Sequence, residues 1–243
     1  MKILAIETST MLGGIAVVDD SSGLIAEVRL NVKSTHSERL MTEIDHVMVR
    51  SFMKLSDVDV FAIAIGPGSF TGLRIGLSTV KGLSYATGKP IVAVPTLEAF
   101  AWNFPYCRYP LCPMLDARKK EVYTALFRWD RDGFVRLIGE VSASIIGFLD
   151  RVSVTPPIPP FAGDVGGERK IVFAGEGALL YKKEIVEHLG DMALFPPSEK
   201  MAPSPANVAI VGLRKALQGD FSEPVGLAPS YIRSSEAEIK WNG

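Results

Sequence analysis

The segment of residues 65–76 constrains this chain more than any other part of it. It reads Ile65-Gly66-Pro67-Gly68-Ser69-Phe70-Thr71-Gly72-Leu73-Arg74-Ile75-Gly76. An apolar run typical of a strand precedes it, and a pattern typical of a helix follows it to about Tyr85. A strand that ends in glycines and enters a helix presents free backbone N–H groups at the helix N-terminus, which suit an anion. The alternative is a tight turn whose glycines allow close packing.

The spacing of these glycines excludes two common phosphate-binding motifs. Gly-x-Gly-x-x-x-Gly is one residue longer than the dinucleotide fingerprint, and the Gly-Lys-Ser/Thr ending of a P-loop is missing. A basic residue in the first turn of a helix opposes the helix dipole. We therefore expect Arg74 to have a partner, either an acidic side chain such as Glu7 or an anion held at Gly68–Thr71.

Hydrophobic periodicity predicts two tandem βββαβα copies. The first copy has strands at 2–7, 14–19 and 24–31, a helix at 36–53, a strand at 60–65, a helix at 72–85 and a further strand at 91–94. The second has strands at 111–116, 121–128 and 134–141, a helix at 144–152, a strand at 170–174, a helix at 179–189, a short strand at 193–195 and a helix at 205–217.

The sequence also indicates where the first helix starts, where the two lobes divide and where an insertion lies. Thr35 and Glu38 predict a capping box at the start of the first helix. We expect an N-terminal lobe over residues 1–102 and a C-terminal lobe over 103–243. Residues 153–169 are rich in Pro and Gly and predict a surface insertion in the second copy.

Four segments of the chain, in order, resemble the TsaB (YeaZ) family of bacterial tRNA-modification proteins. They are the glycine segment 65–76, Ile3-Leu4-Ala5-Ile6-Glu7-Thr8-Ser9, Leu115-Asp116-Ala117-Arg118-Lys119-Lys120-Glu121-Val122-Tyr123 and Pro229-Ser230-Tyr231-Ile232-Arg233. Independently, the tandem βββαβα order is similar to the α/β fold of the actin/sugar-kinase/Hsp70 (ASKHA) superfamily.

The resemblance implies a function and a set of partners. It implies a non-catalytic paralogue that holds TsaD in its working state while a threonylcarbamoyl group is moved onto the adenosine beside the anticodon of tRNAs that read codons starting with A. TsaD would form a heterodimer with this chain, the ATPase TsaE would join the complex, and the chain alone would form a homodimer. It would meet tRNA only indirectly, through the complex.

The resemblance to the superfamily also implies where a nucleotide or anion would lie. The candidate residues are Glu7, Thr8, Ser9, Gly66, Gly68, Ser69, Thr71, Gly72 and Arg74. The counterpart in the second copy, Asp116-Ala117-Arg118-Lys119, is not rich in glycine. We expect no resident cofactor and leave open a nucleotide at the interface between partners.

Residues that could carry catalysis are scarce. TsaD binds its metal through a His-x-x-x-His motif, and the corresponding positions here are Thr96 and Phe100. The three histidines are scattered, and no serine lies in a nucleophile elbow. We expect no catalytic residue and no metal. The alternatives are a stand-alone small-molecule kinase or ATPase of the ASKHA type, with Glu7 as its acid, and a metallopeptidase, which the missing histidine pair disfavours.

The helix at 36–53 carries more apolar surface than one core face requires. The candidates for contact with a partner are Met41, Met48, Val49 and Phe52, with Gly76 and Thr79 on the next helix. Leu40 and Ile44 are expected in the core. In TsaB-like proteins these two helices form a bundle with the same helices of a second molecule. The alternative is a helix buried on both sides by its own chain.

Composition limits the compartment and the ligands. The net charge of −1, from 26 basic and 27 acidic residues, predicts no nucleic-acid surface. Net charge leaves a local basic patch open, but no run of basic residues indicates one. Cys107 and Cys112 have neither metal-knuckle nor redox spacing, so we expect two free thiols. The sequence shows no signal peptide and no membrane span, and we expect a cytoplasmic protein.

Overall fold

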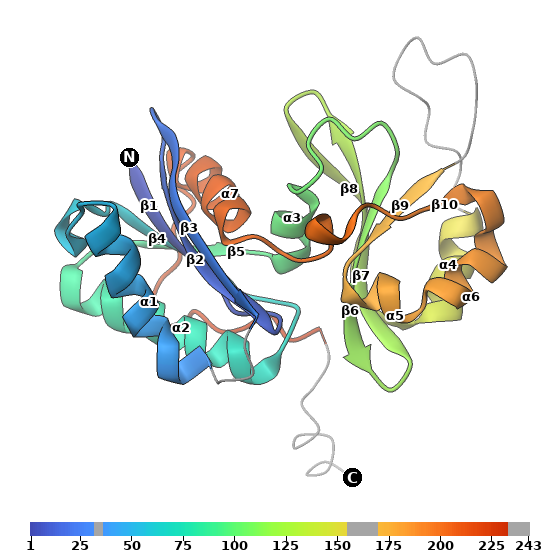
Figure 1. Cartoon of the computed structure of the whole chain (residues 1–243), viewed down its shortest axis with the longest axis horizontal. Coiled ribbons are helices and arrows are strands. Elements are labelled where there is room, and N and C mark those ends of the chain that lie inside the picture. Colours follow the sequence, from blue (N-terminus) through green and yellow to red (C-terminus); the bar gives the residue numbers. More distant parts are fainter. Residues whose placement is uncertain (32–35, 155–169, 233–243) are drawn as a thin grey trace. The chain divides into compact units, whose positions relative to one another are not determined.

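The computed structural model describes residues 1–31, 36–154 and 170–232. The chain divides into two compact units, one formed by Met1–Phe100 together with the segment that begins at Pro203, the other by Ala101–Ala202. Each unit is built around one five-stranded sheet (Figure 1). None of the helices in the described part of the chain has both the length and the apolar character needed to cross a bilayer.

The sheet of the first unit has the order β3-β2-β1-β4-β5. Its strands are β1 (Lys2–Glu7), β2 (Leu12–Asp19), β3 (Gly23–Asn31), β4 (Val60–Ala64) and β5 (Ile91–Val94). Strand β1 is antiparallel to β2 and parallel to β4. The strands β1 and β4 are apolar along almost their whole length, as expected for strands that are covered on both faces.

Helices cover both faces of this sheet (Figure 1). The helices along this part of the chain are α1 (His36–Arg50), the short 3-10 helix η1 (Leu55–Asp57), α2 (Phe70–Thr87), α3 (Thr96–Ala101) and α7 (Pro205–Leu217), of which α1, α2 and α7 pack on the sheet. Helices α1 and α2 contact each other and pack on one face, while α7 packs on β1, β2, β4 and β5 from the opposite face.

The second unit repeats this plan, with the sheet order β10-β9-β6-β7-β8. Its strands are β6 (Leu111–Arg118), β7 (Glu121–Asp130), β8 (Gly133–Ser144), β9 (Ile171–Ala174) and β10 (Ala193–Leu194). Its helices are α4 (Ile145–Val154), α5 (Glu176–Leu180), α6 (Lys182–Leu189), η2 (Gly190–Met192) and η3 (Ser198–Lys200). Because β6, β7, β8, β9 and β10 take the places of β1, β2, β3, β4 and β5, the predicted duplication and fold class are confirmed.

Two predictions about the elements need correction, and one helix was missed. Helix α7 belongs to the first unit and not to a lobe running from 103 to 243, because its apolar face packs on the first sheet. The helix predicted at 179–189 is two helices that meet at Tyr181. Helix α3 was not predicted. The predicted capping box of Thr35 with Glu38, and nearly all of the predicted insertion, lie outside the described residues.

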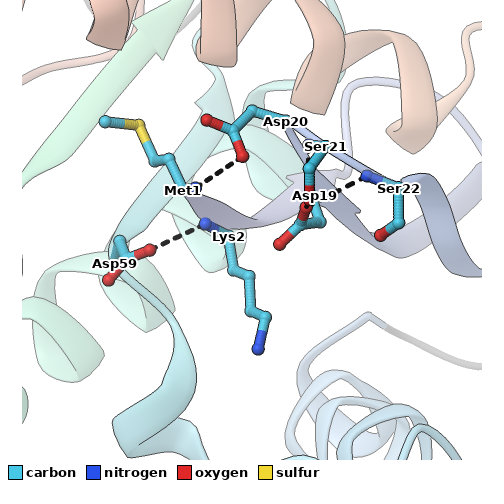
Figure 2. Close-up of polar contacts among 7 residues, drawn as sticks. All are labelled: Met1, Lys2, Asp19, Asp20, Ser21, Ser22 and Asp59. Carbon is cyan, nitrogen blue, oxygen red and sulfur yellow. Dashed lines mark hydrogen bonds and ion pairs between the residues drawn. The ribbon is translucent and has the colours of Figure 1, made fainter.

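Polar contacts stabilise the N-terminus, the start of β1 and the β2–β3 turn (Figure 2). The N-terminal amine of Met1 lies 2.7 Å from Oδ1 of Asp20, and the backbone N–H of Lys2 donates to Oδ2 of Asp59 at 2.8 Å. In the β2–β3 turn, Asp19 accepts hydrogen bonds from the hydroxyl and the N–H of Ser21 and from the N–H of Ser22. These bonds lower the pKa of Asp19 to about 2, because they stabilise its ionised form.

Candidate functional site

The glycine loop joins β4 to α2 and lies against two other parts of the first unit. The N–H of Gly66 donates to the hydroxyl of Thr96 at 3.1 Å, and the N–H of Thr96 donates back to the carbonyl of Gly66 at 2.8 Å. The N–H of Ser69 donates to the carbonyl of Ser9 at 2.6 Å. The loop is therefore fixed on one side to the start of α3 and on the other to the turn between β1 and β2.

Close approach to the β1–β2 turn explains why glycine occupies the loop. A Cβ atom added to Gly68 would collide with the backbone of Ser9, and one added to Gly72 would collide with the carbonyl oxygen of Thr8. Gly68 also has a φ of 159°, and Gly66 has a φ of 117°, which L-residues rarely adopt. The packing role expected for these glycines is thus present in the structure.

Glu7 ends β1 with a fully buried carboxyl group. Its Oε1 accepts the N–H of Ser9 at 2.5 Å. Its Oε2 is buried without a hydrogen-bond partner in the described structure, as is the hydroxyl of Thr8. Burial raises the pKa of Glu7 to about 7, and the hydrogen bond from Ser9 acts in the opposite direction. The predicted contact between Glu7 and its own turn is present, and half of its carboxyl group remains unpaired.

Arg74 has a partner that the sequence did not indicate. Its Nε donates to the hydroxyl of Tyr231 at 2.9 Å, and its guanidinium lies 3.8 Å from the centroid of the Phe70 ring. The rings of Phe70 and Tyr231 stack at 4.8 Å. The expected pairing with Glu7 is therefore wrong, since the Glu7 carboxyl points into the core and Arg74 is exposed.

The remaining loop residues have ordinary structural roles. Ser69 is the N-cap of α2 and its hydroxyl accepts the N–H of Gly72 at 3.3 Å. Thr71 is exposed in the first turn. The N–H of Ser230 donates to the carbonyl of Ile65 at 2.7 Å. Ser230 and Tyr231 were not predicted as site residues, although they lie in one of the four family-like segments. That segment contacts the glycine segment at Ile65 and Arg74.

The residues at the two positions that correspond to the metal-binding motif are not suited to hold a metal ion. The hydroxyl of Thr96 is used by Gly66, and Phe100 is buried in the core and has no atom that can coordinate a cation. Among the described residues, no group of three or more His, Cys, Asp and Glu side chains lies close enough to hold a metal ion. Both cysteines are free thiols, Cys107 half-buried and Cys112 buried, as predicted.

The predicted partner surface on α1 divides into exposed and buried parts. Met41, Val49 and Phe52 are exposed, with exposed fractions of 55%, 64% and 98%. Met48 is 5% exposed and belongs to the core cluster that includes Leu40, so its assignment to the contact surface is wrong. The residues Met53 and Leu55, which follow the helix, pack against that cluster.

The predicted contacts on α2 also need correction. Gly76 is buried, and a Cβ atom there would collide with the hydroxyl of Thr8, so its small size serves packing within the chain. Thr79 is half-buried and its hydroxyl donates to the carbonyl of Ile75 at 2.9 Å. Tyr85 is 94% exposed on the same helix and was not predicted. The exposed apolar residues are therefore Met41 and Val49 on α1, Tyr85 on α2, and Phe52 in the turn after α1.

The duplicated sheets and the glycine loop define the class, an α/β protein of the ASKHA type with two units. Among solved structures, YeaZ from Pseudomonas aeruginosa has the same fold, with a TM-score of 0.74 at 22% identity over 95% of this chain and 99% of that chain. A second Pseudomonas aeruginosa structure, an uncharacterized protein with similarity to peptidase YEAZ, gives a TM-score of 0.75 at 23% identity over 96% and 99%.

Sequence comparison gives the family. Residues 24–241 match the family model described as TsaD: tRNA N6-adenosine threonylcarbamoyltransferase. The chain is 30% identical to the tRNA threonylcarbamoyladenosine biosynthesis protein TsaB of Bacillus subtilis, over 99% of this chain and 98% of that protein. It is 33% identical to TsaB of Escherichia coli over 55% of this chain and 58% of that protein. The chain belongs to the TsaB/YeaZ family.

Proposed function

We propose that this chain serves tRNA threonylcarbamoyladenosine biosynthesis as a non-catalytic partner of a TsaD-type transferase. Its TsaB relatives carry that pathway in their names. The observation that supports a partner role most directly is the exposure of Met41 and Val49 on α1 and of Phe52 in the turn after it. Large apolar side chains gathered on one exposed helix mark interaction surfaces.

The residues of the glycine loop support a non-catalytic role. Hydroxyls that could act as nucleophiles are engaged in structure, since Ser69 caps α2 and Thr96 bonds to Gly66. The carboxyl group of Glu7 is fully buried, which does not suit an acid that must contact a substrate. In this proposal TsaD supplies the transfer chemistry, TsaE joins as the ATPase, and any nucleotide lies at an interface between partners.

The same exposed residues would pair two copies of this chain when the transferase is absent. A two-fold association uses the same patch on both molecules, so one surface would serve the homodimer and the heterodimer in turn. The alternative function, a stand-alone ASKHA-type kinase or ATPase, requires the isolated chain to turn over ATP with a phosphate acceptor. That assay on the isolated chain distinguishes the two functions.

The partner surface is tested by placing a charge on it. Val49→Asp should abolish the homodimer and co-purification with the TsaD-type transferase, because an unpaired charge in a desolvated contact costs about 3–5 kcal/mol. The circular dichroism spectrum should stay that of the parent, since Val49 is 64% exposed. The threonylcarbamoylation activity of the reconstituted mixture should fall with the complex.

Two control variants frame this experiment. Val225→Asp changes an exposed apolar residue outside α1 and α2, with an exposed fraction of 96%, and should leave assembly intact. Met48→Asp puts the charge in the core and should unfold the protein. Normal dimerisation and full activity of Val49→Asp would refute the assigned surface, and normal assembly of folded Met48→Asp would refute the division between core and surface.

A further inference from the structure

The turn between β6 and β7 has a sequence that does not suit its conformation. Arg118 pairs with Glu121, so Lys119 and Lys120 form a two-residue connection. The φ angles of Arg118, Lys119 and Lys120 are 65°, 54° and 62°. Two-residue hairpins with positive φ at both central positions are type I′ turns, which favour Asn-Gly or Asp-Gly. Positive φ is uncommon for other residues, so this turn gives up stability to carry two lysines.

The three residues of the turn, Arg118, Lys119 and Lys120, are all basic and exposed. The side chain of Arg118 is 85% exposed, while that of Asp116, whose Oδ2 lies 3.5 Å from Nη1 of Arg118, is 17% exposed. Lys119 and Lys120 are also exposed. Glu176 is an exposed acidic residue near Asp116 and Arg118, and burial, with the charge of Asp116, raises its pKa. The turn itself therefore presents three cations, with the carboxylate of Asp116 beside Arg118.

The backbone of the turn is held by the sheet beneath it. The N–H of Arg118 donates to Oδ1 of Asp116 at 2.9 Å, and β7 is paired along its length with β8. The three cations are thus presented on a fixed, convex hairpin end. Small phosphate ligands such as nucleotides bind in concave sites that enclose them. A convex basic turn instead suits the phosphates of a nucleic-acid backbone, which lysine and arginine contact without reading sequence.

We infer that the Arg118-Lys119-Lys120 turn contacts the phosphate backbone of the tRNA substrate. This inference rests on the proposed function, and it gives this chain a direct contact with tRNA where composition predicted none. The overall charge of −1 gave no sign of the basic triplet, because net charge is a sum over the whole chain. Contact with a nucleic-acid backbone needs only a local cluster of basic residues. Lysines at turn positions that favour Asn-Gly cost stability, and residues that contradict the local conformation in this way are expected at functional sites.

The test separates charge from stability. In Lys119→Asn/Lys120→Gly, the preferred type I′ pair replaces the lysines, and we expect a thermal midpoint equal to or above that of the parent. Binding of an unmodified transcript of a tRNA that reads an A-starting codon, measured in the complex with the TsaD-type transferase and TsaE, should weaken roughly tenfold. The slope of log K against log salt should fall by about 1.4 to 1.8, the value for two lost phosphate contacts.

The matched control reverses the charge of two lysines elsewhere in the same unit. Lys119→Glu/Lys120→Glu and Lys182→Glu/Lys183→Glu change the net charge equally, but only the first should weaken tRNA binding. Equal weakening by both pairs, or parental affinity and salt slope in both turn variants, would overturn the inference. ATP binding lost from the turn variants while tRNA binding stays parental would also overturn it and assign a nucleotide instead. If the parental chain forms no active complex, it is the proposed function that fails.

Discussion

Replacing Glu7 by Gln should remove the part of the pH dependence of stability that Glu7 causes between about pH 5 and about pH 8. The carboxyl group is fully buried, its Oε2 is unpaired, and burial raises its pKa from 4.5 to about 7. The folded chain therefore holds a proton that the unfolded chain releases. Because the folded state binds more protons in this window, the free energy of unfolding falls as pH rises.

The size of the effect follows from the shift in pKa. The stabilisation is fully present below the unfolded pKa of 4.5 and is lost as pH rises through the folded pKa of about 7. At 1.36 kcal/mol per unit of pKa, the loss amounts to about 3 kcal/mol at alkaline pH. A glutamine keeps an oxygen that can accept the N–H of Ser9 and cannot ionise, so Glu7→Gln should be more stable than the parent above about pH 7.

Urea unfolding of both proteins at a series of pH values measures this difference. The quantity of interest is the free energy of the variant minus that of the parent, because other groups shared by the two proteins cancel in it. Asp19, with a pKa of about 2, titrates below the window in any case. A constant difference between variant and parent across the window would refute the argument, since it would mean that Glu7 is ionised in the folded protein.

Two further predictions concern the glycine loop and the buried thiol. Gly72→Ala should destabilise the protein by several kcal/mol, because the added methyl group collides with the carbonyl of Thr8. In Gly82→Ala, on the same helix, the methyl group meets open space and should stabilise the protein by up to about 1 kcal/mol. Denaturant unfolding of both variants measures these changes, and similar changes in the free energy of unfolding would contradict the prediction. Burial raises the pKa of Cys112 to about 12, so this thiol should stay unmodified by a thiol-specific reagent in the native protein and react only on unfolding. Cys107 should react before Cys112. Rapid labelling of Cys112 in the native protein would contradict its burial.

The order of elements and the fold class were predictable from the sequence. Strands such as Lys2–Glu7 and Ile91–Val94 were placed at their observed bounds, because continuous apolar runs bounded by turn residues leave few alternatives. The duplication followed from the repeated order of elements. The glycine loop was also found, since only close backbone packing and unusual φ angles require glycine at such spacing.

Which helical residues face the core was decided by the tertiary structure. Met41 and Met48 are seven residues apart, so helical periodicity places them on the same side of α1. Met41 is nevertheless exposed and Met48 buried, because the chain beyond the helix returns to the core that contains Met48. Periodicity describes one helix and carries no information about a later segment that covers part of it.

The partners of the site residues were likewise set by the fold. Arg74 meets Tyr231 across 157 positions of sequence, and α7 packs on the first sheet although it follows the whole second unit. Local sequence specifies conformation through steric and periodic constraints that act over a few residues. Contacts between distant segments depend on how complete sheets pack their apolar faces, and for this chain only the tertiary structure supplied them.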